Sequence, residues 1–135
     1  MNKYSENKLV EKPTMELFGK LGYQVLDCMH EEVGENSTLG RETRRDVVLE
    51  LRLRQALERL NPTLYEESIG TAVTELTKDR STRHPTLANK EVHELLKGGV
   101  RISVKTKEGS IRGQTVRVVD WDTPENNDFF LASQF

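Results

Sequence analysis

The spacing of apolar residues predicts that the chain begins with a helix, from about Ser5 to Leu21. Pro13 either kinks this helix or lies in the first turn of a helix that begins near Lys12. Gly22 is expected to end it, and residues 23–27 are expected to form a short strand. The apolar face of the helix is predicted to consist of Met15, Leu17, Phe18 and Leu21.

Three more helices are predicted in the middle of the chain. The acidic segment His30–Thr38 is expected to be a loop, and the second helix runs from about Asp46 to Leu60, with Asn61-Pro62 ending it. A capping box of Thr63 and Glu66 is expected to open the third helix. The apolar stripe of the third helix comprises Ile69, Ala72, Val73 and Leu76. That of the fourth helix comprises Val92, Leu95 and Leu96. The fourth helix is expected to have Asn89 as its cap and to end at Gly98-Gly99.

After Gly99 the period changes to two, which is typical of strands. Val100, Ile102 and Val104 alternate with polar residues, and residues 107–110 read as a hairpin turn. A second strand is expected from residue 111 through 121, with a bulge at Gly113. A third, Phe129–Phe135, is apolar on both faces and is therefore predicted to be a buried central strand. Because the chain stops inside this strand, we expect the domain to continue beyond Phe135.

Composition narrows the class of protein. The chain has 135 residues, 31% of them charged, with a net charge of -2 and a pI near 6.0. This favours one soluble domain, and any nucleic-acid site must be a local patch because the bulk charge does not favour one. A single cysteine excludes an internal disulfide. The sequence has no apolar run of membrane-spanning length and no signal-peptide pattern, so we expect a cytoplasmic protein without membrane contact.

Three segments resemble the N-terminal region of the R subunits of type I restriction-modification enzymes. They are residues 45–62, residues 93–100, and the run Asp120-Trp121-Asp122-Thr123-Pro124-Glu125-Asn126-Asn127-Asp128-Phe129 closing on Gln134-Phe135. Glu11-Lys12-Pro13 before Leu21-Gly22-Tyr23 fits as well. The resemblance covers nearly the whole chain, and the last segment is its most specific part.

The resemblance implies an α+β fold of the restriction-endonuclease type. This is a mixed sheet with an N-terminal helix and an α-helical insertion, incomplete at the C-terminus. Residues 1–135 would form one incomplete N-terminal nuclease domain, with the helical insertion at about 41–98 and the strand-rich part at about 100–135.

The resemblance also implies a function for the parent subunit. It would be an ATP-dependent, DNA-translocating and Mg-dependent endonuclease that cuts unmodified foreign DNA. Its partners would be DNA, the methylation and specificity subunits and the rest of the R subunit. The family's catalytic Asp and Glu-x-Lys follow the segment that matches Gln134-Phe135, so this chain is expected to lack catalytic residues, to be inactive alone and to bind neither Mg nor ATP.

Two sets of residues in the chain are candidates for chemistry. Glu11 shares a helix face with Met15 and Phe18, where it is a candidate metal ligand, although the alternative of a capping or exposed position near Pro13 is favoured. Arg44 and Arg45 are the best candidates for DNA contact within a cluster that also holds Arg41, Arg52, Arg54 and Arg59. Interleaved acidic residues favour the alternative that most of this cluster is a solvated, neutralised face.

Other motifs carry little weight. Glu6-Asn7-Lys8 matches Glu-x-Lys only by chance, since no Asp precedes it. Cys28, His30, His84 and His93 lack the spacing of zinc ligands. Residues 34–40 do not fit a phosphate loop, because Arg41 stands where Lys is required. Two alternatives to the nuclease fragment remain: a non-catalytic module that docks DNA or protein, and a standalone small binding protein.

Overall fold

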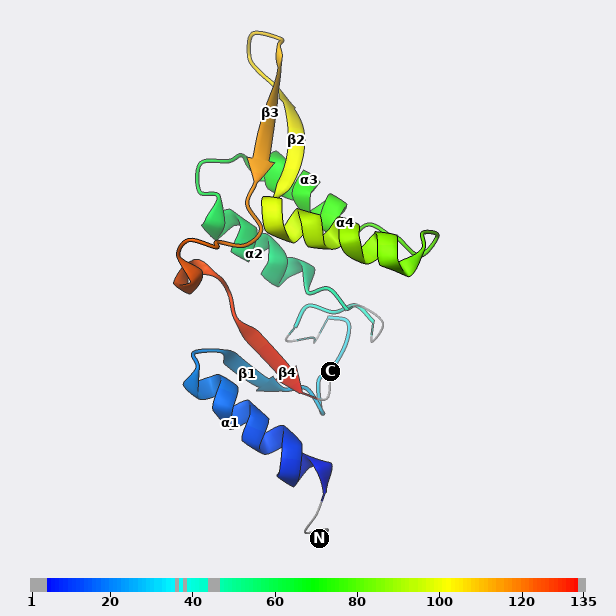
Figure 1. Ribbon diagram of the computed structural model, residues 1–135, viewed down its shortest axis with the longest axis vertical. Coiled ribbons are helices and arrows are strands. Elements are labelled where there is room, and N and C mark those ends of the chain that lie inside the picture. The colour runs from blue at the N-terminus through cyan, green and yellow to red at the C-terminus, as the bar shows by residue number, and fades with distance from the viewer. Residues whose placement is uncertain (1–4, 36, 38, 44–46, 134–135) are drawn as a thin grey trace. The chain divides into compact units, whose positions relative to one another are not determined.

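The computed structural model describes residues 5–35, 37, 39–43 and 47–133, and these residues divide into two compact units. Unit 1 comprises residues 1–44 and 128–135, and unit 2 is the inserted segment 45–127. The hairpin therefore belongs to the same unit as the inserted helices. Figure 1 shows the elements of each unit. The α+β class is confirmed, while the restriction-endonuclease topology stays a prediction.

Unit 1 combines one helix with a parallel pair of strands. A π-helical turn, η1 (Asn7–Glu11), leads into α1 (Lys12–Lys20), so Pro13 lies in the first turn of α1. Gly22 ends the helix with a φ of +96°, a conformation that a side chain disfavours. β1 (Gln24–Asp27) then pairs in parallel with β4 (Phe130–Ser133), from Gln24 opposite Phe130 to Asp27 opposite Ser133. Parallel strands need a long connection, and unit 2 lies within it.

Aromatic rings join α1 to this sheet. Phe18 meets Tyr23 edge to face with centroids 4.8 Å apart, and Tyr23 lies 5.1 Å from Phe129. Leu17 and Leu21, predicted to face the core, are instead 55% and 65% exposed. The helix turns Phe18 and Met15 toward its partners, so that its two leucines remain on the opposite side. That part of the predicted apolar face was wrong.

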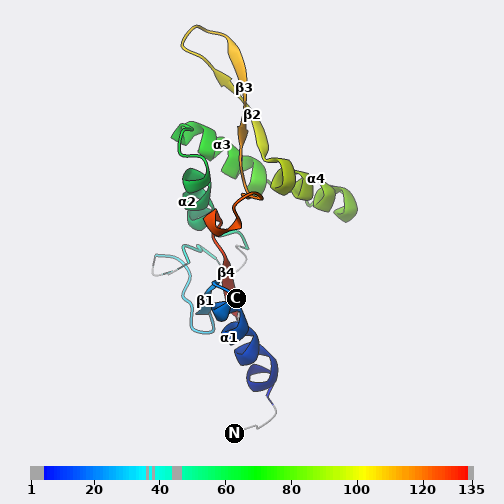
Figure 2. The ribbon, with the colours of Figure 1, turned by 60° about the vertical axis from the view of Figure 1, so that its left-hand side comes forward.

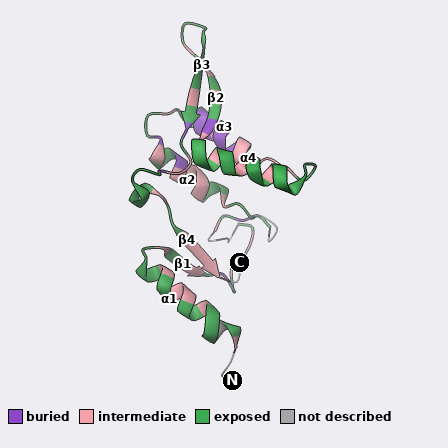
Figure 3. Cartoon of the chain, in the orientation of Figure 1, coloured by how far each residue is buried: buried purple, intermediate pink, exposed green. Residues whose placement is uncertain are grey.

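The prediction that β4 is a buried central strand was also wrong for this chain. All four of its residues are only partly buried, and among the described residues its one partner strand is β1. An apolar strand is buried on both faces only where other elements cover both faces, and Figure 3 shows intermediate and exposed colours throughout α1, β1 and β4.

Unit 2 has the larger core. α2 (Glu50–Leu60), α3 (Glu66–Thr77) and α4 (Pro85–Gly98) precede an antiparallel hairpin of β2 (Val100–Lys105) and β3 (Ile111–Val116). The buried side chains come from α2, α3 and the base of the hairpin, as Figure 3 shows: Leu57, Ile69, Ala72, Val73, Val100 and Val116. Each large aliphatic side chain buried here contributes about 2 kcal/mol. The predicted stripe of the third helix is thus confirmed: its first three residues are buried, and Leu76 is partly buried against the same core.

Several predicted helix starts were wrong. α2 begins at Glu50 rather than near Asp46, which lies outside the described residues; the β-branched Val47 and Val48 that precede it are exposed and disfavour helix. Thr63 forms no capping box, because a turn in which Leu64 N–H donates to Asn61 O precedes α3, and Tyr65 is its cap residue.

The cap of the fourth helix lies five residues before the predicted cap, Asn89. His84 is the cap residue of α4, where its Nδ1 accepts from Thr86 N–H at 3.3 Å and Pro85 takes the first helical position. Asn89 therefore lies inside the helix and the cap prediction was wrong. The end at Gly98-Gly99 is confirmed, with Gly99 at a φ of +83°.

The hairpin is regular. Ser103 pairs with Gly113 in an uninterrupted register, so the predicted bulge is absent. β3 ends at Val116 instead of continuing to residue 121, since a side chain replaces the neighbouring strand beyond this point: Asn61 bonds the backbone of Arg117. A short 3-10 helix, η2 (Pro124–Asn126), follows.

Candidate functional site

The loop after β3 is organised around one buried carboxylate. Asp120 is 6% exposed, and its Oδ1 accepts the backbone N–H groups of Asp122 at 3.1 Å and Thr123 at 2.9 Å. Its Oδ2 accepts from Asn126 Nδ2 at 3.0 Å. Arg117 Nη1 lies 3.6 Å from Oδ1. The side chain of Asp120 thus serves as an internal cap for its own loop.

Asn127 closes the same loop from the other end. Its Oδ1 accepts from Asp120 N–H at 2.8 Å, and its Nδ2 donates to Asp120 O at 2.9 Å and to Pro124 O at 3.0 Å. Four residues of this sequence segment thus satisfy each other's polar groups in a tight loop: Asp120, Pro124, Asn126 and Asn127.

The hydrogen bonds also fix the charge state of Asp120. Donation by Asn126, then by the backbone of Thr123 and Asp122, together with the nearby Arg117 charge, lowers the pKa of Asp120 below its ordinary value despite burial. The carboxylate is ionised at neutral pH and its oxygens are already used by the loop, which accounts for an Asp at this position without a bound metal.

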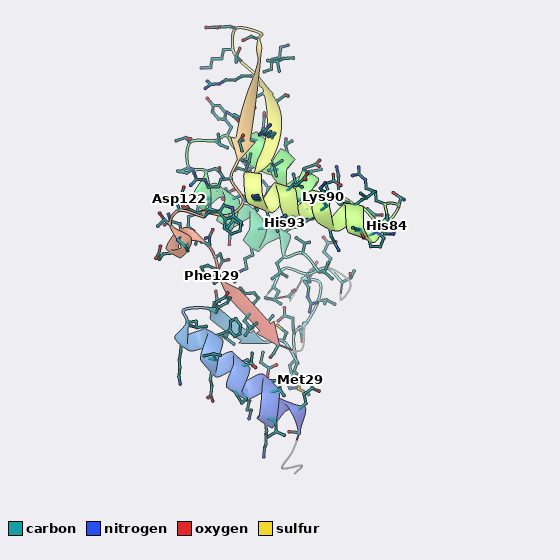
Figure 4. All side chains as sticks on the ribbon, viewed as in Figure 1. Met29, His84, Lys90, His93, Asp122 and Phe129 are labelled. Atoms are coloured by element: carbon teal, nitrogen blue, oxygen red, sulfur yellow. The ribbon has the colours of Figure 1, made fainter. Side chains whose placement is uncertain are left out.

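Trp121 lies on the surface beside this loop. It is 64% exposed, and its indole Nε1–H donates to Lys97 O at 3.2 Å at the end of α4. A hollow of about 270 Å³ adjoins it, lined by Lys97, Gly98, Gly99, Thr115, Arg117, Val119, Trp121 and Asp122. A second hollow of about 510 Å³ lies between Trp121 and α4, whose His93 and Lys90 side chains are labelled in Figure 4.

The hairpin carries the most basic surface of the described chain segments. We call residues 100–117 the basic ribbon: they contain five basic residues and one acidic residue, Glu108. Four of the basic side chains are exposed and, within the described part of the chain, form no ion pair: Arg101, Lys105, Lys107 and Arg112. Figure 2 shows the ribbon extending away from α2, α3 and α4.

Basic residues elsewhere in unit 2 are engaged differently. Lys78, Arg80 and Arg83 surround Glu91, and Lys78 and Arg80 also pair with Glu75. The guanidinium of Arg80 donates to backbone carbonyls at the end of α3, including Glu75 O at 2.7 Å. This network ties α3 to α4 and leaves little positive charge for a ligand.

Comparison with known proteins places the chain in a family. The sequence model of the family described as "Type I restriction enzyme R protein N terminus" matches residues 3–135. The chain belongs to this family. The resemblance of this chain to the N-terminal region of type I restriction enzyme R subunits is therefore confirmed.

The chain is also similar in sequence to two proteins that are named as endonuclease subunits. The chain is 26% identical over 133 residues, 98% of its length, to the "Putative type I restriction enzyme MjaIXP endonuclease subunit" of Methanocaldococcus jannaschii. It is 33% identical over 88 residues, 65% of its length, to the "Type I restriction enzyme HindI endonuclease subunit" of Haemophilus influenzae. The chain spans 12% and 8% of the lengths of these relatives. No solved structure matches it.

The metal candidate of the sequence, Glu11, ends the η1 turn. It is partly buried, as are Met15 and Phe18, which agrees with the predicted shared face, and it is engaged with its surroundings. Within residues 5–35, 37, 39–43 and 47–133, no three His, Cys, Asp or Glu side chains gather closely enough to hold a metal ion. The role of Glu11 stays a prediction.

Of the arginine cluster, Arg44 and Arg45 lie outside the described residues, so their contact with DNA stays a prediction. Arg41 is buried at 3% exposure, and Arg59 Nη2 donates to Asn126 O at 3.0 Å. The Arg54 guanidinium lies beside Gly70 of α3. The described members are thus used in packing and loop contacts.

The basic ribbon and Trp121 were missed by sequence reasoning. A signal for the ribbon was present: cations at alternating strand positions, Arg101 and Lys105, with only Glu108 to oppose them. It was overlooked because the net charge of the whole chain is negative. None of the helices among the described residues has the length and hydrophobicity needed to cross a lipid bilayer.

Proposed function

We propose that this chain is the N-terminal part of the R subunit of a type I restriction enzyme, and that the complete subunit is an ATP-dependent, DNA-translocating, Mg-dependent endonuclease acting on unmodified foreign DNA. The family match over residues 3–135 carries the proposal. The endonuclease names of both relatives support the nuclease part. Its partners would be DNA, the methylation and specificity subunits and the rest of the R subunit, in the cytoplasm.

We propose that this chain does not hold a complete magnesium site by itself. Mg²⁺ takes oxygen ligands, usually one or two carboxylates with water and phosphate oxygens. Asp120 is occupied by its own loop, and Glu11 has no two acidic, His or Cys neighbours among the described residues. We therefore assign no catalytic step to this chain and propose that it is a scaffold for residues that follow the segment matching Gln134-Phe135.

The test compares two lengths of the protein. The 135-residue chain and a version extended downstream to include an Asp and a Glu-x-Lys are incubated with supercoiled plasmid, with Mg²⁺ or with EDTA. We expect nicking only by the extended protein with Mg²⁺. Replacing the Asp of the extension by Asn should abolish the nicking, while Glu11→Gln in the extended protein tests whether Glu11 contributes.

Nicking by the 135-residue chain itself, abolished by Glu11→Gln, would contradict the scaffold role. ATP hydrolysis is measured separately on the complete subunit, where stimulation by DNA is expected. A second function, non-catalytic docking of DNA, is favoured by one specific observation: four exposed cations of the basic ribbon form no ion pair with any residue that the structure describes.

A further inference from the structure

We propose that the basic ribbon is a DNA-binding element that contacts the phosphate backbone of a duplex through three side chains, those of Arg101, Lys105 and Arg112. Lys107, in the turn of the hairpin, adds to the positive charge of the ribbon. This deepens the proposed function and rests on it for the identity of the polyanion. The inference concerns residues that the arginine cluster of the sequence did not include.

The first argument is local charge. The ribbon has a net charge of +4, from five basic residues and Glu108, whereas the whole chain has a net charge of -2. The positive potential is therefore concentrated on one element. DNA binding depends on such concentration, because neutralising neighbouring phosphates releases condensed counterions.

The second argument is availability. Four ribbon cations are exposed and make no ion pair within the described chain: Arg101, Lys105, Lys107 and Arg112. By contrast, the cations near the start of α4 surround Glu91: Lys78, Arg80 and Arg83. A cation that already has a carboxylate partner gains little from a phosphate, because it must exchange one anion for another. The ribbon cations lose no such partner on binding.

The third argument is shape. A two-stranded ribbon fits the major groove of DNA, which is about 12 Å wide. Pairing of Lys105 with Ile111 and of Val104 with Arg112 sets the faces of the strands. Arg101 and Lys105 project from one face, and Arg112 from the other. Cations on both faces can reach the phosphates on both walls of a groove.

The base of the ribbon is fixed while its outer half is free to enter a groove. Val100 and Val116 are buried against the helices, and Ser68 Oγ of α3 donates to Gln114 Oε1 at 3.1 Å. Beyond that point Lys105, Ile111 and Arg112 are exposed, and Figure 4 shows side chains projecting from both sides of the hairpin. The ribbon is therefore a rigidly anchored arm.

The contacts proposed are to phosphates, which carry no sequence information. We expect binding to be independent of base sequence and steeply dependent on salt. With three contacts, the logarithm of the association constant should fall with the logarithm of salt concentration at a slope of about -2.7 from these residues alone.

The experiment measures, by fluorescence anisotropy, the binding of the 135-residue chain to a labelled duplex of arbitrary sequence. EDTA is present, and the salt concentration is varied from about 50 to about 200 mM. The test variant is Arg101→Gln/Lys105→Gln/Arg112→Gln. The matched control, Lys12→Gln/Lys20→Gln/Lys90→Gln, removes the same charge from exposed positions of α1 and α4. Circular dichroism and thermal unfolding verify that both variants fold.

We expect the ribbon variant to lose most of the salt dependence, with each single substitution reducing the slope by about 1. The control should retain the slope and most of the affinity. Equal losses of affinity in both variants, or wild-type affinity in the ribbon variant, would overturn the proposal. Failure of the wild-type chain to bind the duplex would also overturn it, and would point to an acidic protein surface as the partner. Because EDTA excludes cleavage, this outcome is independent of the nuclease test.

Discussion

The side chain of Asn61 holds the backbone of Arg117 through two hydrogen bonds of 2.8 Å, one in each direction. Arg117 N–H donates to Asn61 Oδ1, and Asn61 Nδ2 donates to Arg117 O and also to Leu57 O at 2.8 Å. Asn61 is 9% exposed. Asn61, at the end of α2, thus gives the backbone of Arg117 the two hydrogen bonds that a neighbouring strand would provide. These bonds fix the position of the chain just before the Asp120 loop.

We expect Asn61→Ala to lower the free energy of unfolding by about 1–3 kcal/mol, because the backbone N–H and C=O of Arg117 lose their partner in a partly buried place. Chemical denaturation measures this. The matched control is Asn89→Ala, at an exposed position inside α4, where alanine should be neutral or slightly stabilising. Equal stabilities of the two variants would contradict the bridging role of Asn61.

Two glycines with nearly the same positive φ should differ in their tolerance of alanine. Gly99 and Gly109 have φ of +83° and +82°. A Cβ at Gly99 would lie 2.7 Å from Val116 O and 2.8 Å from Thr115 Cγ2, whereas nothing lies within 4 Å at Gly109. Gly109→Ala should cost about 1–2 kcal/mol from the left-handed conformation alone.

Gly99→Ala should cost more than Gly109→Ala, by about 1–3 kcal/mol, because it adds a clash with backbone at the base of the ribbon. Thermal unfolding of the two variants under identical conditions gives the difference. If both variants unfold at the same temperature, then the close approach of Gly99 to Val116 is not a constraint on the fold.

Acid should selectively weaken the Asp120 loop. The pKa of Asp120 is lowered in the folded chain, chiefly by Asn126 and by the N–H of Thr123. The ionised carboxylate therefore stabilises the fold above the ordinary carboxyl pKa of 3.8, and this contribution is lost as the pH falls through the lower, folded value.

Asp120→Asn should accordingly be less stable than wild type at neutral pH, and the difference should narrow below about pH 4. Denaturation curves across this pH range measure it. Asn126→Ala, which removes the main donor, should raise the pKa of Asp120 toward its ordinary value in an NMR titration. A stability difference that does not change with pH would show that the charge of Asp120 is not what the loop requires.

Some features could be read from the sequence because they depend on nearby residues. The period of apolar positions is enough to distinguish the helices from the hairpin, and Gly22 and Gly99 mark helix ends because their backbone conformation excludes most side chains. The family could also be recognised from the sequence, since several segments along the chain resemble it and the family model matches residues 3–135.

Features that depend on distant residues could not be read in this way. An apolar period shows which face of a helix is hydrophobic but not what covers it, so Leu17 and Leu21 are exposed on a helix whose position was predicted correctly. The caps of α3 and α4 depend on the turns before them, and capping residues such as Thr63 and Asn89 have other uses in loops and helices.

The sequence alone determined the class of elements, their order and the family, because these follow from local periodicity and from runs of neighbouring residues along the chain. The tertiary structure alone decided that the end of α2 bonds the chain after β3 through Asn61 and Arg117, 56 residues apart. It also decided that, among the described residues, four ribbon cations form no ion pair while the cations around Glu91 do. Pairing of charges and amides depends on distance in space, and a one-dimensional pattern does not contain that distance.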